Sequence, residues 1–465
     1  MARPNKYGSA GLGVRQPRPS PDWTQGSIIS NLLRMSWPMV VSSSLNMLGP
    51  TIDMIWVGRL GSTAIAGVGV AGIAVQLLMS AVMGMGMGMR AMIARSIGAR
   101  DPASANHVAI QSFVVSAVFA AVMAVVGLFL SEAIMRLFPL EEGVILEGAT
   151  YLRIVFVGAI AMILRMMCET AMQAAGDAQT PMRIAVLFRA FHVALCPFMV
   201  LGWWVFPQLG VTGAALTNII SQSLGLGLSL WYLTSGRTSL RLTLRGFRVD
   251  ASTIWRIVRI GVPASIMGMQ QALGGFVFVR IMSVFGTYAV AAHTVSQRVE
   301  MVLFMPVVGL GTAAGVLAGQ NLGARHPERA ERGGWIAAGL AVGFMAVCCG
   351  GLLLGAEGVV SIFNQESGLV DMGSVFIRIA TAGYILIGLM IVLQFCISGA
   401  GDTVPAMLFS VLIVWGVQIP LAYLLPEVTD LGVYGVRWAI VVAIAVGAVA
   451  YILYFRTGRW KRKRL

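Results

Sequence analysis

Charged residues are scarce along the whole of this sequence. They make up 11% of its 465 residues, whereas 57% are hydrophobic and the mean hydropathy is +0.82. A soluble globular domain carries about 25% charged residues, so this composition excludes a chain of soluble domains. The deficit is spread over the full length, which predicts an integral membrane protein that crosses the lipid bilayer many times and has little mass outside it.

Acidic residues are the scarcer of the two charge types, with 19 Asp and Glu against 33 Lys and Arg, for a net charge of +14. A basic chain often binds nucleic acid. Here the basic residues gather at the ends of apolar segments, where the preference of Lys and Arg for cytoplasmic loops accounts for them. No nucleic-acid partner is therefore expected.

The sequence also lacks the motifs of several chemistries. Its five cysteines fall in apolar segments, with no CxxC pair and no histidine cluster at ligand spacing, so no metal site is expected. No Walker motif is present, and the glycines at 84, 86 and 88 lie inside an apolar run, unlike a dinucleotide-binding loop. No cofactor, no ATP drive and no enzymatic activity are expected. The first 25 residues lack the apolar stretch of a signal peptide and predict a disordered cytoplasmic tail.

Twelve apolar runs are long enough to cross a bilayer as helices. They are continuous, without the alternation of a membrane barrel strand, and Gly and Pro separate them. The expected fold is an all-α membrane protein with spans near residues 32–56, 64–89, 108–130, 149–172, 182–204, 211–233, 256–282, 288–318, 334–355, 373–397, 404–425 and 433–455.

Basic residues fall almost entirely on one side of these spans, which predicts that both termini are cytoplasmic. Isolated cases such as Arg59, Arg136 and Arg437 are expected in the outer loops. The longest basic interruption lies near the middle of the chain. We therefore expect a tail at 1–26, an N-lobe at 27–233, a cytoplasmic linker at 234–255, a C-lobe at 256–456 and a basic tail at 457–465.

The two predicted lobes repeat one another. Pro38 and Pro263 are 225 residues apart, and Gly98-Ala99-Arg100-Asp101-Pro102 matches Gly323-Ala324-Arg325-His326-Pro327 at the same offset. Ala-Gly-Asp recurs at 175–177 and 400–402. Several landmarks at one offset indicate duplication. With six spans in each copy, both copies have the same orientation, and sites for substrate and ion are expected between or within two pseudo-symmetric bundles.

A few polar residues interrupt the spans and are candidates for function. Asp53 is an acid at membrane depth, where a charge costs about 2.5–3.5 kcal/mol, so we expect a proton or ion site; the alternative is a carboxylate near the outer end that reaches the interface. His192 is a second cation-coupling candidate, expected to titrate near neutrality or to lie beside Asp53, with a neutral histidine hydrogen-bonded to a facing helix as its alternative. Glu300 is the third, its alternative being an ion pair with Arg280 or Arg298.

Other polar and flexible residues have structural explanations beside functional ones. Asn46 and Gln271 stand at equivalent repeat positions and are expected to line a substrate cavity, although interhelical hydrogen bonds would also explain them. Arg165 and Glu169, four residues apart, predict a local ion pair, and Arg189 is expected to snorkel toward the cytoplasmic interface. For the alternating Met and Gly of residues 83–89, we favour close helix packing through glycine with Met facing lipid.

Three stretches resemble the multidrug and toxic compound extrusion (MATE) family. Residues 53–66, with Pro38 before them, resemble its first span. Gly319-Gln320-Asn321-Leu322-Gly323-Ala324 resembles the loop after its eighth span, and Gly399-Ala400-Gly401-Asp402-Thr403 the loop after its tenth. The resemblance runs from about residue 27 to 455. It implies a two-lobed secondary transporter of twelve helices that exports organic, often cationic, compounds in exchange for H⁺ or Na⁺.

The resemblance also identifies departures from the family pattern. Asp53 matches the acid of the N-lobe cavity. Where relatives carry Asn-x-x-x-Asp-Pro in the fifth span, this chain has His192 and Cys196 before Pro197. Gln271 replaces a Glu of sodium-coupled members, and their tenth-span Asp falls on Ile387. The multi-carboxylate sodium sites of those members are therefore not expected here.

Together these patterns predict an antiporter of the inner (plasma) membrane that exports cationic amphipathic compounds by rocking of two lobes, driven by a gradient of H⁺ or Na⁺. Its partners would be a drug-like small molecule, the coupling cation and the bilayer, and we expect a monomer. The alternative transporter is a flippase for lipid-linked precursors. A flippase would favour several cationic residues facing the cavity, whereas here Arg and Lys gather at the inner edge.

Overall fold

The computed structural model describes residues 22–203 and 207–463, and every regular element among them is helical. The first half contains α1 (Ile28–Val57), α2 (Ser62–Gly98), α3 (Pro102–Met135), α4 (Glu142–Val157), α5 (Ala159–Ala174), α6 (Gln179–Leu201) and α7 (Gly210–Thr234). The second contains α8 (Ala251–Ser283), α9 (Thr287–Gly323), α10 (Pro327–Ser361), α11 (Ser367–Gly399), α12 (Thr403–Val411), α13 (Ile419–Val428) and α14 (Val433–Arg456). Short 3₁₀ turns follow α1 at Gly58–Leu60 and α14 at Arg459–Arg462.

These helices form six rods in each half. The α4–α5 pair is one rod bent by 50°, and α12 continues through a π-helical turn at Leu412–Gln418 into α13. Among the described helices, nine are long and apolar enough to cross a membrane, and the bent pair makes a tenth. The other two rods, α1 and α7, carry a series of Ser, Asn, Asp and Gln side chains that lower their apolarity. The predicted all-α membrane fold is confirmed.

The duplication inferred from the sequence is visible in the backbone. Helices α2 and α9 begin and end 225 residues apart, and so do the α4–α5 rod and α11. Arg100 (φ 59°) and Arg325 (φ 63°) are the only described non-glycine residues in the left-handed region. That region is costly for L-residues other than glycine, so its recurrence at one offset identifies two copies of a single structure.

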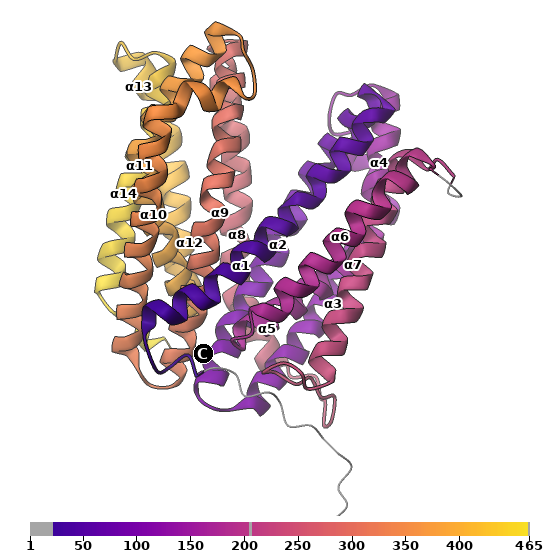
Figure 1. Cartoon of the computed structure of the whole chain (residues 1–465), viewed down its shortest axis with the longest axis vertical. Helices are drawn as coiled ribbons and strands as arrows, with labels where there is room; N and C mark the ends of the chain where they lie inside the picture. The colour runs from indigo at the N-terminus through magenta and orange to yellow at the C-terminus, as the bar shows by residue number, and fades with distance from the viewer. Residues whose placement is uncertain (1–21, 204–206, 464–465) are drawn as a thin grey trace, which may run out of the picture.

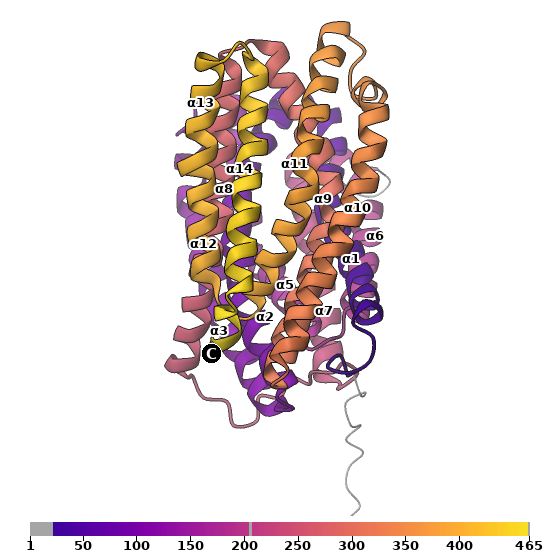
Figure 2. The ribbon, with the colours of Figure 1, turned by 90° about the vertical axis from the view of Figure 1, so that its left-hand side faces the viewer.

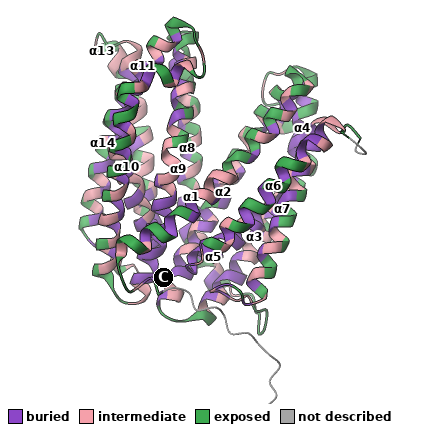
Figure 3. Ribbon diagram, in the orientation of Figure 1, coloured by how far each residue is buried: buried purple, intermediate pink, exposed green. Residues whose placement is uncertain are grey.

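Figure 1 shows α1–α7, here called the N-lobe, beside α8–α14, the C-lobe. The lobes meet at the end that holds the C-terminus and diverge toward the other end, and Figure 2 gives the turned view. Most of the N-lobe helices share one hydrophobic core and those of the C-lobe two others. The residues buried in these cores lie along the inner faces of the helices (Figure 3). The helix-free interval from 235 to 250 falls within the predicted linker.

Helix α1 connects the two lobes. Its first turns, with Leu32, Met35 and Met39, belong to the main core of the C-lobe. Its last turns, with Asp53 and Val57, lie in the N-lobe, where α1 packs on α6 and α7. A change of contacts at either end of α1 therefore alters the packing of both lobes.

Glycines hold the lobes together at two places. A Cβ on Gly84 or Gly88 of α2 would lie 2.5 Å from the carbonyl oxygen of Gly261 or Ile257 on α8, which confirms close packing as the reason for the Gly-Met run. The lipid-facing expectation for the methionines holds for Met83, which is exposed, but is wrong for Met89, which is fully buried. At the joined end, Gly98 meets the Gln320 carbonyl and Gly323 meets the Arg95 carbonyl.

Gly323→Ala is expected to prevent the joined end from closing. The new methyl group would overlap the Arg95 carbonyl oxygen and lie 3.0 Å from the Ala99 nitrogen, and neither is a flexible side chain. Gly343→Ala is the matched control, because no atom lies within 4 Å of its Cβ and alanine gains about 1 kcal/mol over glycine in a helix. Spin-label distances between α2 and α9 at this end should lengthen for Gly323→Ala only. Unchanged distances would contradict the packing.

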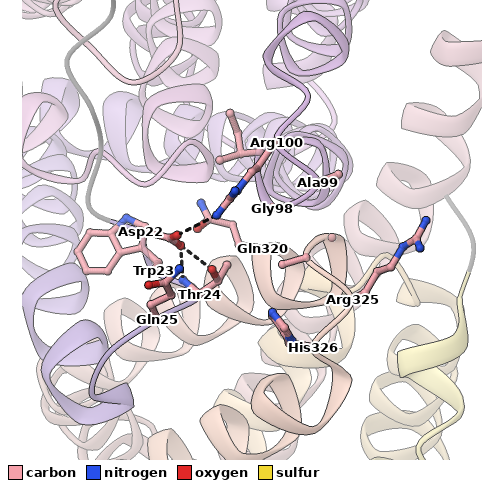
Figure 4. Close-up of a pocket in the computed structure, with 13 residues that line it drawn as sticks. Asp22, Trp23, Thr24, Gln25, Gly98, Ala99, Arg100, Gln320, Arg325 and His326 are labelled. Carbon is pink, nitrogen blue, oxygen red and sulfur yellow. Dashed lines mark hydrogen bonds and ion pairs between the residues drawn. The ribbon is translucent and has the colours of Figure 1, made fainter.

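The chain just before α1 covers the same end. We assigned residues 22–26 to the tail, but Trp23 is buried and its Nε1 donates to the Gly176 carbonyl of the N-lobe at 3.1 Å. The same indole belongs to the main core of the C-lobe. Asp22 and Trp23 border a pocket of about 580 Å³ that Arg100, Arg325 and His326 also line, with Arg100 paired to Asp22 at 3.6 Å (Figure 4). The remaining tail residues, 1–21, lie outside the described residues.

Candidate functional site

Asp53 lies inside the N-lobe, with 1% of the residue exposed. Its Oδ1 is 3.0 Å from Nε2 of His192 on α6 and 3.8 Å from Sγ of Cys196, and its Oδ2 accepts from Nδ2 of Asn218 on α7 at 3.4 Å. The alternative in which Asp53 reaches the membrane interface is therefore wrong. The carboxylate ties the last turns of α1 to two other helices.

The hydrogen bonds of His192 define where its proton lies. The ring is fully buried, and its Nδ1 is 2.9 Å from a guanidinium nitrogen of Arg189. A guanidinium only donates, so Nδ1 accepts, and Nε2 must then carry the proton that is donated to Asp53. His192 is thus assigned as a neutral imidazole between a cation and a carboxylate. Arg189 is 4% exposed and lies one helical turn away, so our expectation that it snorkels to the interface is wrong.

A second polar layer lies next to this one in the N-lobe. Arg165 and Glu169 form the predicted ion pair at 3.0 Å. Asn46 of α1 accepts from Arg165 at 3.1 Å and donates to Glu169 at 3.3 Å, while its backbone carbonyl accepts from Arg189 at 3.4 Å. The amide of Asn46 is therefore engaged inside the lobe. A continuous chain of polar contacts leads from Asp53 through His192 and Arg189 to Glu169.

The repeat partner of Asn46 has a different environment. Gln271 is exposed on α8, whereas its neighbour Gln270 is buried and donates to Ser410 at 2.6 Å. The structure does not bring Asn46 and Gln271 into one hydrogen-bonded group among the described residues. Their shared role in lining a substrate cavity stays a prediction.

Glu300 belongs to a separate polar cluster in the C-lobe. It pairs with Arg437 of α14 at 2.9 Å and accepts from the Tyr384 hydroxyl of α11 at 3.0 Å, while Arg437 also lies 3.3 Å from Nδ1 of His293. The predicted partners Arg280 and Arg298 are wrong. Arg437 is 1% exposed, so its expected place in an outer loop is also wrong. The charge of Glu300 is already balanced by a buried guanidinium.

The two clusters do not occupy equivalent positions of the repeat. The N-lobe cluster is built by α1, α6 and α7, and the C-lobe cluster by α9, α11 and α14. At the offset of 225, Asp53 corresponds to Phe278, and Glu300 corresponds to Val75. The copies share the order of their helices, although the counterpart of α6 contains a π-helical turn, and they place their charges on different helices.

The sequence carries little signal for several of these residues. Asn218 and His293 are not among the candidates, and Cys196 appears only as one of the five cysteines in apolar segments and as a departure from the family pattern. A signal was present on α6, because Arg189, His192 and Cys196 follow one another at spacings of three and four and so share a face. No local signal links that face to Asp53 or Asn218, which are supplied by other helices.

The same geometry gathers possible metal ligands. A carboxylate oxygen of Asp53, a ring nitrogen of His192 and the sulfur of Cys196 all lie within 4.8 Å of one another and are buried. We expected no metal site because the sequence holds no cluster at ligand spacing. The third donor comes from α1, 139 residues before His192, which no spacing rule can anticipate.

Comparison with known proteins gives a consistent result over most of the chain. The MatE family model matches residues 38–198 and 263–424, one match in each half. The chain is 28% identical over 437 residues to "Probable multidrug resistance protein YoeA" of Bacillus subtilis, covering 92% of this chain and 93% of that one. It is 26% identical over 444 residues to "Probable multidrug resistance protein NorM" of Thermotoga maritima, covering 94% of each.

Solved structures show the same fold. One described as "Crystal structure of MATE in the bent conformation" has a TM-score of 0.88 at 24% identity, with 94% of this chain and 96% of that chain covered. Another, "Outward-facing conformation of a multidrug resistance MATE family transporter of the MOP superfamily", also has a TM-score of 0.88 at 24% identity, with 95% and 98% covered. The two matched repeats and the full-length relatives establish that this chain is a transporter and not an enzyme, and that it belongs to the multidrug and toxic compound extrusion (MATE) family.

Proposed function

We propose that this protein is a proton-coupled antiporter that exports organic, cationic amphipathic compounds across the inner (plasma) membrane by rocking of its two lobes. The observation that carries the proposal is the buried carboxylate of Asp53 on α1, the helix that joins both lobes, and its contact with His192 of α6. An ionisable group enclosed in a membrane-spanning bundle is costly and is a site of ion or proton movement by default.

Protonation of Asp53 would change the contacts of α1. The ionised carboxylate accepts from His192 and Asn218, and the thiol of Cys196 also points to it. A proton on Oδ1 replaces that acceptor with a donor facing the Nε2–H of His192, so this contact is lost. Because the first turns of α1 lie in the C-lobe, the loss biases how the lobes pack. A proton and a cationic substrate are natural alternatives at such a site.

The donor atoms favour H⁺ over Na⁺ as the coupling ion. Hard cations prefer carboxylate, carbonyl and water oxygens, whereas imidazole and thiol groups suit softer ions. Around Asp53 this chain supplies His192 and Cys196, and Asn218 directs an N–H at the carboxylate. A sodium ion would find too few oxygens here, while a proton needs only the carboxylate.

Orientation, substrate and assembly follow from the same reasoning. Most Lys and Arg of the loops lie at the joined end of the lobes, which we propose faces the cytoplasm together with both termini. The diverging end then faces outward. Relatives named for multidrug resistance support a drug-like organic substrate, and one relative is named a FAD transporter, from Shewanella oneidensis. The protein would act as a monomer, without a cofactor.

Buried arginines bear on the flippase alternative. We expected Arg and Lys at the inner edge, but Arg165, Arg189 and Arg437 lie inside the lobes. Arg165 and Arg437 are each paired with a glutamate, and Arg189 is bonded to His192. Cations engaged in this way are not free to hold the phosphates of a lipid-linked precursor, so drug export is favoured.

The test is dye efflux from proteoliposomes with an imposed gradient. A cationic dye should leave the wild-type vesicles when a pH gradient is imposed and should not respond to a sodium gradient of equal size at constant pH. Collapsing the pH gradient with a protonophore should stop efflux. Sodium-driven efflux that survives the protonophore would overturn proton coupling.

A further inference from the structure

We propose that Asp53, His192 and Cys196 form a binding site for a thiophilic divalent cation, with Zn²⁺ and Cd²⁺ as the ions that fit it, and that such an ion blocks the coupling site. The binding itself goes beyond the proposed function, and only the block rests on it. The sequence indicated His192 as a possible neighbour of Asp53, but no ligand spacing that joins these two to Cys196.

The separations of the donor atoms match a tetrahedral metal site. Zinc lies about 2.0 Å from nitrogen and oxygen ligands and about 2.3 Å from sulfur, which places tetrahedral ligand atoms about 3.3–3.6 Å apart. The observed separations are 3.0 Å between His192 Nε2 and Asp53 Oδ1, and 3.8 Å between Cys196 Sγ and the same oxygen. Adjustments of a few tenths of an ångström would suit these two pairs, and all three donor atoms lie within 4.8 Å of one another.

A fourth ligand position is adjacent. Asn218 lies 3.4 Å from the second oxygen of Asp53 and directs its amide nitrogen there. Rotation of the amide would present its carbonyl oxygen, and a water molecule could fill the position instead. Because Asp53, His192 and Cys196 come from two helices packed in one lobe, the three protein ligands are already held together before an ion arrives.

The charges also balance. A divalent cation with one carboxylate, one thiolate and one neutral imidazole has no net charge, which suits a buried site. Binding breaks the S–H bond of Cys196 and forms a metal–sulfur bond, and the thiol proton leaves to solvent. The proton on Nε2 of His192 moves to Nδ1. The ion would occupy the Asp53 carboxylate that the proposed function uses, so it blocks that site by occupancy.

Arg189 opposes this ion and sets its affinity. It donates to Nδ1 of His192 at 2.9 Å, the nitrogen that must carry a proton once Nε2 binds metal. The guanidinium must then withdraw toward the Asn46 carbonyl, which it already contacts at 3.4 Å. Removing Arg189 should therefore tighten metal binding, an effect opposite in sign to the loss of a ligand.

The experiment titrates the purified full-length protein with Cd²⁺ and follows the cadmium–thiolate charge-transfer absorbance. The wild type should show one saturable band that Cys196→Ser removes and that Cys168→Ser, at another fully buried cysteine, leaves unchanged. Asp53→Asn and His192→Gln should weaken binding at least about tenfold, and Arg189→Met should tighten it about tenfold, each equal to about 1.4 kcal/mol.

Two further measurements keep the outcome decisive. Bound Cd²⁺ should protect Cys196 of the wild type from alkylation, measured by mass spectrometry, which needs no variant and therefore no assumption about folding. Cd²⁺ should also inhibit dye efflux by the wild type. A band that persists in Cys196→Ser, or protection of other cysteines alone, overturns the site. Binding without inhibition retains the site and rejects the block, and absent efflux in untreated vesicles counts against the transport proposal only.

Discussion

Asp53→Asn is expected to reduce gradient-driven efflux to the level of protein-free vesicles while the protein still folds. The substituted amide is nearly the same size as the carboxyl group and can still accept from Nε2 of His192 through its oxygen. It cannot bind and release a proton. Reconstituted protein should therefore bind substrate and fail to respond to an imposed pH gradient, measured as dye efflux beside an unchanged melting temperature.

The control for this variant is Asp371→Asn, which makes the same chemical change at an exposed position of α11. Its efflux should equal that of the wild type. Full transport by Asp53→Asn under a pH gradient would rule out Asp53 as the coupling group. A melting temperature that falls together with activity would instead indicate that the carboxylate serves the packing of α1, α6 and α7.

Arg437→Met is expected to destabilise the C-lobe by about 3–5 kcal/mol, because it leaves the Glu300 carboxylate without its buried partner. The guanidinium is 1% exposed and the carboxylate side chain 22% exposed, so water compensates for little of the loss. Glu300→Gln strands the guanidinium and should destabilise as well. The double variant removes both charges and should recover most of the stability, measured by thermal unfolding in detergent.

An exposed ion pair provides the comparison. Arg136 and Glu142 lie 2.6 Å apart with side chains about half exposed, and removing either should leave the melting temperature nearly unchanged. The double variant of Glu300 and Arg437 also tests the third coupling candidate. If Glu300 serves only to pair with Arg437, the double variant retains proton-driven efflux. A stable double variant without efflux would instead assign Glu300 to coupling.

The architecture could be predicted from the sequence because it depends on patterns within short segments and on their repetition. The length of the apolar runs gave the spans, and landmarks such as Pro38 with Pro263 gave the duplication before any contact was known. The positions of α1 and Asp53 were predictable for the same reason. A carboxylate within an apolar run can be recognised from the sequence alone.

The partners of the site were harder to predict, because they depend on contacts between helices. Arg437 stands four residues after the start of α14 and resembles a loop residue in sequence, yet its long side chain reaches inward to α9. Arg189 has the composition of a snorkelling cation, but the missing side chain at Gly49 leaves the space that it fills. Neither outcome follows from spacing along one helix.

The different placement of charge in two matching halves has a consequence for energy conversion. In the C-lobe the position equivalent to Asp53 is Phe278, so that lobe holds no acid there. An aspartate installed at Phe278, which is 3% exposed, would place a second ionisable group inside the C-lobe. Evolution or design could in this way raise the number of protons spent per exported molecule, and with it the steepest gradient of drug that the pump can sustain.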